Sequence, residues 1–192
     1  MTKIILASAS PRRIELLKTL GLDFICIKPE TEEQFIAGET ACQAAERLAV
    51  QKADSIKTLD EDSLIISADT VVLCDGKILG KPENEAEART MLTLLSGRSH
   101  KVITAVCLKN HRGEIEVQSE ITAVFFRNLS QEEITGYIAT GEPFDKAGGY
   151  GIQGKGAVLV DRIEGCYFNV VGLPLGRLYD MLKKQNVEVL GV

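Results

Sequence analysis

The stretch KIILASASPRRIELLKTLG, residues 3–21, contains the two elements that decide the fold. Its first five residues form an apolar run typical of a buried strand, and the segment that starts at Pro11 has the composition of a helix. Ser10 is a suitable N-cap, Pro11 suits the first helical position, and Gly21 favours the end of the helix. A strand, a short loop and a helix in this order predict the start of an α/β fold.

Two arginines, Arg12 and Arg13, fall in the first turn of this helix. The helix dipole makes that end positive, so it favours acidic side chains and disfavours cations. Backbone N–H groups at a helix N-terminus, together with the Ser8 and Ser10 hydroxyls, form a ready site for a phosphate group. Arginine can bind the same phosphate in bidentate fashion. A solvated basic turn explains the two arginines equally well, so the stretch alone leaves both interpretations open.

The rest of the chain alternates helices and strands and then changes to a meander, which indicates an α/β fold with a mixed sheet. Strands are expected at residues 23–27, at 64–79 as a hairpin turning at Asp75-Gly76, in a long hairpin turning near His111, and at 157–163. Helices are expected at residues 41–57, 84–97, 130–141 and 173–184, with capping signals at Thr40, Asn84 and Ser130.

Composition and charge restrict the function classes. The 192 residues carry a formal net charge of −5, which argues against general nucleic-acid binding. Any anion site must therefore be a local group of Lys and Arg on an acidic protein. The five cysteines are scattered without a C-x-x-C pair, which favours buried thiols in a reducing compartment. No stretch reaches the ~18 apolar residues of a membrane span, so we expect no membrane partner and a cytoplasmic location.

Two charged residues lie where the hydrophobic pattern predicts buried positions. Lys52 falls in the middle of the apolar stripe of the helix at 41–57, so it must pair, extend to solvent or bind a ligand. Asp69 lies between the apolar runs LIISA and TVVL, where a carboxylate is costly unless a cation or hydrogen bonds compensate it. A salt bridge or a capping role would also explain Asp69. We favour a functional role because acids are rare in such contexts.

Three further stretches are less informative on their own. Lys81 lies in the motif GKP, in a rigid loop after the hairpin, and a solvated turn residue explains it equally well. The acidic loop ETEEQF contains Glu30, Glu32 and Glu33, which are either exposed side chains or ligands for a hard cation. GYGIQG, residues 149–154, matches G-x-G-x-x-G, but a dinucleotide site needs a helix after this motif and here a strand pattern follows. We therefore interpret it as a loop whose glycines let the backbone approach a ligand.

The remaining chemistry is basic groups, hydroxyls, a strand-embedded aspartate and nearby acids, with only two histidines. This set suits phosphate-ester hydrolysis assisted by a divalent cation. Lys and Arg would bind phosphates, carboxylates would hold Mg²⁺, and one carboxylate would activate water. Spacing alone does not say which phosphate bond is broken.

Several long motifs in the same order give the whole chain a specific resemblance to a known family. LASASPRR, ISADTVV, LSGRSHKVITAV and GEPFDKAGGYGIQGKGAVLVDRIEG resemble the Maf-like nucleoside triphosphate pyrophosphatases, in particular the branch that prefers dTTP and UTP. The resemblance implies one domain over residues 1–192 with a mixed twisted sheet, flanking helices and two lobes around a deep central cleft, as in inosine triphosphate pyrophosphatases. It also implies cleavage between the α and β phosphates with Mg²⁺ or Mn²⁺.

The resemblance further implies roles for individual residues. The proton-accepting aspartate of the family falls on Asp69, which would also bind the metal together with Glu33. The acidic loop departs from the alternating acids of many relatives, which leaves open whether Glu32 or Glu33 is the ligand. The residues tied to substrate choice match Arg12, Thr70 and Gln153, and the phosphate and metal cluster maps onto Ser8, Arg13, Glu33, Lys52 and Lys81.

We therefore expect a cytoplasmic enzyme whose partner is a nucleoside triphosphate and which converts dTTP, UTP or modified pyrimidine nucleotides to the monophosphate and pyrophosphate. The alternative is a nucleotide-sensing regulatory protein of cell division that binds the same ligands without significant catalysis. The sequence leaves the oligomeric state open, with a homodimer as one alternative.

Overall fold

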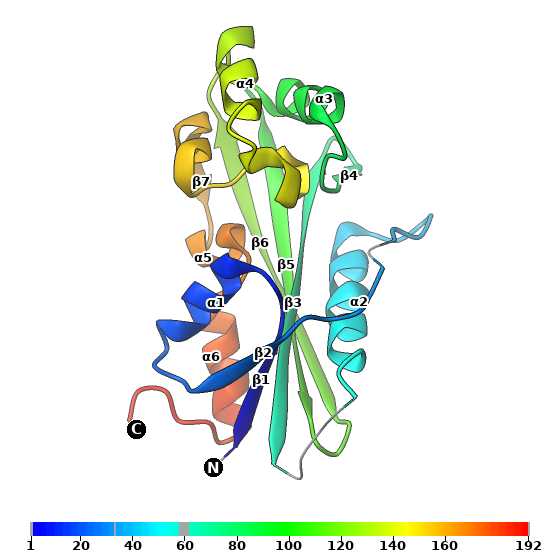
Figure 1. The fold of residues 1–192 in the computed structure, drawn as a ribbon, viewed down its shortest axis with the longest axis vertical. Helices are drawn as coiled ribbons and strands as arrows, with labels where there is room; N and C mark the ends of the chain where they lie inside the picture. Colours follow the sequence, from blue (N-terminus) through cyan, green and yellow to red (C-terminus); the bar gives the residue numbers. More distant parts are fainter. Residues whose placement is uncertain (1, 33, 58–61, 192) are drawn as a thin grey trace. The chain divides into compact units, whose positions relative to one another are not determined.

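The computed structural model describes residues 2–32, 34–57 and 62–191 (Figure 1). Its strands are β1 (Lys3–Ala7), β2 (Phe24–Ile27), β3 (Ser63–Cys74), β4 (Lys77–Leu79), β5 (Ser99–Asn110), β6 (Ile115–Phe126) and β7 (Val160–Glu164). Its α-helices are α1 (Pro11–Lys18), α2 (Ala41–Asp54), α3 (Glu85–Leu95), α4 (Gln131–Ile138), α5 (Tyr167–Val171) and α6 (Leu175–Lys184). Three 3₁₀ helices, η1 (Glu142–Asp145), η2 (Ala147–Gly149) and η3 (Gly154–Leu159), lie between α4 and β7.

The described strands form one mixed sheet of seven strands. Their order is β2-β1-β3-β5-β6-β7, and β4 pairs with β3 beside this path. β1 is parallel to β2 and β3, whereas β4 and β7 are antiparallel to their neighbours β3 and β6. The predicted class, α/β with a mixed sheet and flanking helices, is confirmed.

The chain divides into two compact units, each built from segments that are separate in the sequence. The first unit consists of Met1–Asp69, Thr104–Glu120 and Gly172–Val192, and the second of Thr70–Ile103 and Ile121–Val171. The boundary after Asp69 therefore falls inside β3. The single domain expected over residues 1–192 stays a prediction.

In the first unit, helices cover both faces of the parallel strands (Figure 1). α1 connects β1 to β2, and α2 connects β2 to β3 in the opposite direction across β1. Because such crossovers are right-handed, α1 and α2 lie on opposite faces of the sheet, and α6 lies on the same side as α1. Residues 4–7 of β1 are consequently buried, which explains why this strand reads as an uninterrupted apolar run.

Three predicted helix starts are confirmed by their caps. Thr40 and Gln43 form a capping box at the start of α2, and Ser130 and Glu133 form another at the start of α4. The Asn84 side chain caps α3 through a single hydrogen bond. These caps satisfy backbone N–H groups that the first turn of a helix cannot satisfy by itself.

Of two predicted strand segments, the structure confirms one and contradicts part of the other. The hairpin expected at residues 64–79 is confirmed, because Asp75 and Gly76 have positive φ angles and connect the antiparallel strands β3 and β4. The strand expected at residues 157–163 is wrong in its first half, where the chain forms η3, and β7 begins only at Val160.

Hydrogen bonds inside the loop explain this difference. The backbone N–H groups of Lys155 and Gly156, just before the expected strand, donate to the Glu142 carboxylate at 3.1 and 3.3 Å and so hold the start of η3, which extends to Leu159. α5 was also not predicted. It is held by a buried side chain, Asn169, whose Nδ2 donates to the Thr122 hydroxyl at 2.8 Å.

The core of the second unit gathers apolar side chains from α3 and α4, the strands and the loop that follows α4. Its members include Leu92, Phe126, Ile134, Tyr137 and Tyr150. Among the described helices of both units, none has the length and apolar character needed to cross a membrane.

Candidate functional site

The pairing of β1 with β3 brings two of the predicted residues to the same level of the sheet. Leu6 pairs with Ile66, so Ser8 lies two residues beyond the first partner and Asp69 three residues beyond the second. Both Ser8 and Asp69 are buried. In open α/β sheets ligands bind at the carboxyl ends of parallel strands, and the end of β1 is such a position.

The N-terminus of α1, which follows Ser8 closely, lacks the groups that usually satisfy a helix start. Ser10 occupies the predicted N-cap position, but its side chain forms no capping hydrogen bond and the first turn contains no acidic residue. The Ser10 backbone N–H instead donates to Ser8 Oγ at 3.1 Å. α2, α3 and α4 all have side-chain caps, whereas α6 (Leu175–Lys184) starts without one, as α1 does. Of these two, only α1 adds two arginines to an uncapped first turn. An anion would suit this positive end.

Arg12 and Arg13 are both half-buried in the first turn of α1, which argues against a fully solvated basic turn. Arg13 Nε donates to the carbonyl oxygen of Gly172 at 2.8 Å, and this bond connects α1 to the segment before α6. Arg13 is thus held by the backbone at its Nε.

Lys52 and Asp69 form a buried ion pair in the first unit. Lys52 Nζ donates to Asp69 Oδ1, and the two residues are only 6% and 5% exposed. Of the three alternatives open for Lys52, pairing with an acid is therefore the one observed. The pair lies where α2 packs on β3, because Ser67 Oγ on the same strand donates to the Ala49 carbonyl of α2 at 2.6 Å. Burial of two charges is tolerated because each compensates the other.

Arg47 is a residue near this pair that the sequence pattern did not identify. The helical pattern predicts it on the solvent face of α2, but the structure shows it half-buried. It forms a bidentate pair with Glu39, with Nε–Oε1 and Nη2–Oε2 distances of 2.6 and 2.7 Å. Its Nη2 also donates to the Gln34 carbonyl. The hydrogen bond with Glu39 raises the pKa of Arg47, and Asp69 adds a smaller upward contribution. Arg47 therefore fixes the acidic loop to α2 and adds positive charge near Asp69.

The three remaining substrate residues of the prediction belong to the second unit. Thr70 follows Asp69 on β3 and is half-buried, whereas Lys81 is exposed in the loop after β4. Gln153 is half-buried and occupies the N-cap position of η3, so it lies on the glycine-rich loop as predicted.

The predicted metal ligands are only partly described. Glu33 lies outside the described residues, and Glu32 is exposed and accepts a hydrogen bond from Gln34 at 2.9 Å. Across residues 2–32, 34–57 and 62–191, no three His, Cys, Asp or Glu side chains are grouped so that they could hold a metal ion. Of the predicted metal ligands, this part of the chain contains the buried Asp69 and the exposed alternative Glu32.

His100 of the second unit is deeply buried and has a structural environment. It is 3% exposed, its Nε2 lies 2.6 Å from the Tyr150 hydroxyl, and its ring packs edge-on against Phe126 and Tyr150. Burial lowers the pKa of His100 to about 4, so the ring is neutral at physiological pH. The contact ties the glycine-rich loop to β5, a role that the sequence did not predict.

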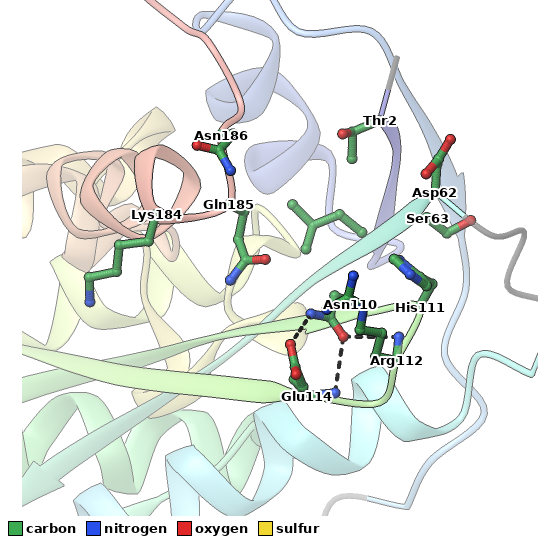
Figure 2. Close-up of a pocket in the computed structure, with 11 residues that line it drawn as sticks. Thr2, Asp62, Ser63, Asn110, His111, Arg112, Glu114, Lys184, Gln185 and Asn186 are labelled. Atoms are coloured by element: carbon green, nitrogen blue, oxygen red, sulfur yellow. Dashed lines mark hydrogen bonds between the residues drawn. The ribbon is translucent and has the colours of Figure 1, made fainter.

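A separate pocket of about 290 Å³ opens at the amino ends of β1 and β3 in the first unit (Figure 2). Thr2, Ser63 and His111 are among the residues that line it. The Asn110 side chain binds Glu114 and the backbone of the hairpin turn there, as the dashed lines in Figure 2 show. None of the predicted site residues lines this pocket, and it lies at the strand ends opposite to Ser8.

Known proteins share both the sequence and the fold of this chain. A relative named dTTP/UTP pyrophosphatase from Syntrophomonas wolfei is 54% identical over 186 residues, which cover 96% of this chain and 98% of the relative. A protein of the same name from Bacillus cereus (strain ZK / E33L) is 48% identical over 189 residues, 98% of each chain.

Among solved structures, the Ham1 protein of Staphylococcus aureus matches with a TM-score of 0.55 at 15% identity, covering 96% of this chain and all of that one. A HAM1 protein from Coxiella burnetii matches with the same TM-score at 17% identity. These likenesses concern the fold, and they agree with the α/β architecture described above. The sequence model described as Maf-like protein matches residues 3–185. This chain therefore belongs to the Maf-like protein family.

Proposed function

We propose that this chain hydrolyses dTTP and UTP to the nucleoside monophosphate and pyrophosphate. Its relatives at about half identity over nearly the full chain carry the name dTTP/UTP pyrophosphatase. The structural observation that carries the proposal is the buried Lys52–Asp69 pair at the level where β1 ends. This pair supplies a carboxylate that can accept a proton and an ammonium that can bind a phosphate, in one place.

Asp69 is the general base in this proposal. Its carboxylate would take a proton from the water that attacks the α-phosphorus, and the pyrophosphate would leave with the electrons of the broken P–O bond. The ammonium of Lys52 donates to Asp69 Oδ1, and an ammonium carries three N–H groups that phosphate oxygens can also accept from. Lys52 would thereby hold the general base Asp69 and the substrate in a fixed relative position.

Phosphate binding would rest on the basic residues and hydroxyls that the family resemblance assigns to it. Ser8 and the uncapped start of α1 offer hydroxyl and backbone N–H donors, and Arg12 and Arg13 lie in the same turn. The family resemblance assigns the same role to Lys81. Donors of this kind, aimed at the charge that develops on the leaving group, are usually the largest contribution to catalysis of this type. The protein as a whole is acidic, so these groups must act locally.

Thr70 and Gln153 would contact the nucleobase or the sugar of the nucleotide. The Gln153 amide offers both a donor and an acceptor, which is complementary to the N3–H and carbonyl oxygens that uracil and thymine share. Across the described residues, no hydrogen bond occupies the Gln153 amide.

We also propose a divalent cation, Mg²⁺ or Mn²⁺, as cofactor. Mg²⁺ is commonly held by one or two carboxylates together with substrate phosphates, and the described residues offer one buried carboxylate, Asp69, and no preformed cluster of acids. This donor set suits a cation that arrives with the nucleotide. Asp69, together with Glu32 or Glu33, would hold it, and when bound it would neutralise phosphate charge and lower the pKa of water.

The cellular setting is part of the same proposal. All five cysteines are free thiols, which suits a reducing cytoplasm. We expect no general binding to nucleic acid, because the net charge is −5. A homodimer is the assembly to be tested, by light scattering.

The test is to incubate the purified protein with UTP or dTTP and Mg²⁺ in H₂¹⁸O and to resolve the products. We expect UMP or dTMP plus pyrophosphate, with ¹⁸O in the monophosphate because water attacks the α-phosphorus. Asp69→Asn should lower kcat by at least about a thousandfold while nucleotide binding stays measurable by calorimetry.

Other products would contradict parts of the proposal. UDP plus phosphate would refute the choice of scissile bond, and full activity of Asp69→Asn would refute the role of that residue. Intact UTP combined with tight binding by the wild type would favour the nucleotide-sensing alternative.

A further inference from the structure

The loop that carries Gln153 is held by a group of side chains that the proposed function does not yet use. This loop, residues 142–156 of the second unit, contains η1, η2 and the start of η3. The three backbone N–H groups nearest to Gln153 that donate to side chains are those of Gly151, Lys155 and Gly156. The side chains that bind them are Tyr137 and Glu142.

Tyr137 holds the loop on the N-terminal side of Gln153. Its hydroxyl, at the buried end of α4, accepts a hydrogen bond from the Gly151 backbone N–H at 3.1 Å. Burial raises the pKa of Tyr137 to about 12, so the hydroxyl keeps its proton at physiological pH. A Cβ atom on Gly156 would lie 2.7 Å from the same hydroxyl, which shows how closely the loop folds over Tyr137.

Glu142 holds the loop on the C-terminal side. Its two carboxylate oxygens accept hydrogen bonds from the N–H groups of Lys155 and Gly156 at the start of η3. A carboxylate at this position also satisfies the positive end of the short helix. The backbone of Glu142 is fixed in turn, because its carbonyl oxygen accepts from Lys146 Nζ at 2.6 Å.

Gln153 lies between these two attachments, two residues after Gly151 and two before Lys155. The two side chains also lie close together, because Glu142 contributes to the raised pKa of Tyr137, and a Cβ atom on Gly156, whose N–H donates to Glu142, would lie 2.7 Å from the Tyr137 hydroxyl. The backbone that carries Gln153 is therefore fixed at both ends by one connected group, although its amide forms no hydrogen bond within the described residues.

We infer that Tyr137 and Glu142 are positioning residues for substrate choice. They hold the Gln153 amide where it meets the pyrimidine base, and they act on the substrate only through Gln153. The inference rests on the proposed function and deepens it. It assigns to the hydroxyl of Tyr137 and the carboxylate of Glu142 part of the preorganisation on which recognition of uracil and thymine depends.

A double-mutant cycle distinguishes this role from a merely structural one. kcat/KM for UTP is measured for the wild type, Tyr137→Phe, Gln153→Ala and the double variant, and a second cycle uses Glu142→Gln. We expect Tyr137→Phe to lower kcat/KM about fivefold and Glu142→Gln about tenfold, mainly through KM. In the Gln153→Ala background each change should have less than a twofold effect, because the residue through which it acts is gone.

Matched controls are available on exposed positions of the same unit. Tyr167→Phe removes the hydroxyl of an exposed tyrosine, and Glu85→Gln removes an exposed carboxylate, and neither should change kcat/KM. Equal reductions with and without the Gln153 side chain would overturn the inference. If Tyr137→Phe does not fold by circular dichroism, the Glu142→Gln cycle decides. If the wild type leaves UTP intact, both the proposed function and this inference are refuted. If the wild type turns over UTP but each substitution has the same fold effect with and without the Gln153 side chain, this inference alone is refuted.

Discussion

Replacing Lys52 by methionine is expected to destabilise the protein far more than the loss of an ordinary surface charge. The Lys52 ammonium binds Asp69 Oδ1, and both residues are almost fully buried. Breaking a buried ion pair from one side leaves the other charge without compensation in a poorly solvated place, which typically costs about 3–5 kcal/mol. We expect a loss of this size in the free energy of unfolding at neutral pH.

The measurement is urea denaturation followed by circular dichroism, since the chain contains no tryptophan. With an m-value of about 2–3 kcal/mol/M, the midpoint should fall by about 1–2 M urea. Lys184→Met is the matched control, because Lys184 is 59% exposed in its side chain and pairs with Glu116 at 2.6 Å. An exposed pair contributes no more than about 1 kcal/mol, so this control should shift the midpoint by less than about 0.5 M.

The double variant Lys52→Met, Asp69→Asn tests the cause of the loss. It removes both charges together, so it should lie within about 1–2 kcal/mol of the wild type and reveal a coupling of at least about 2 kcal/mol. The reasoning is refuted if Lys52→Met is no more harmful than Lys184→Met. It is equally refuted if the double variant loses the sum of the two single losses, because the charges would then not compensate each other.

Two further predictions concern the second unit and use the same denaturation assay. Gly156→Ala should lower the free energy of unfolding by more than about 2 kcal/mol, because its Cβ would lie 2.3 Å from the Gly151 carbonyl oxygen. Gly136→Ala, in open space inside α4, should instead raise it by about 0.5–1 kcal/mol. Equal effects of the two substitutions would contradict this reasoning. The free energy of unfolding should fall by up to about 3 kcal/mol as the pH drops from about 6.5 to about 4. In this range His100 binds a proton in the unfolded state but stays neutral in the folded state, where burial lowers its pKa to about 4. His100→Gln should flatten this slope, and an unchanged slope would show that other groups cause it.

Much of the fold could be predicted because the deciding signals are local. The buried strand of residues 3–7, the Asp75-Gly76 hairpin and the capping boxes at Thr40 and Ser130 each depend on residues within a few positions of one another. Lys52 could be identified by the same logic, because a charged residue in an apolar helical stripe conflicts with the pattern around it. Its partner could not be deduced from that pattern, since Asp69 lies on another element.

The residues that sequence reasoning missed depend on partners in irregular segments. Arg47 has a polar pattern that suits the solvent face of α2, but its partner Glu39 lies in a loop whose path follows no periodicity. The end of η3, residues 157–159, has the apolar residues of a strand, but the Glu142 carboxylate, from an earlier part of the loop, binds backbone N–H groups at the start of this short helix. No spacing rule connects either acid to its partner, so only the folded loop reveals them.

The local conflicts of the first unit lie around the end of β1, and this coincidence is the strongest structural argument for a phosphate site there. Two arginines occupy a helix turn that favours acids, and the Ser10 side chain leaves that turn uncapped. At the same level of the sheet, Lys52 and Asp69 bury two charges. Each feature opposes stability when taken alone. α2, α3 and α4 have side-chain caps; α6 lacks one, as α1 does, but its first turn carries no pair of adjacent arginines. Solvated arginines would explain the first conflict but not the buried pair, and a structural ion pair would explain the pair but not the uncapped helix. A bound phosphate explains both, because it satisfies the helix end and the basic side chains together.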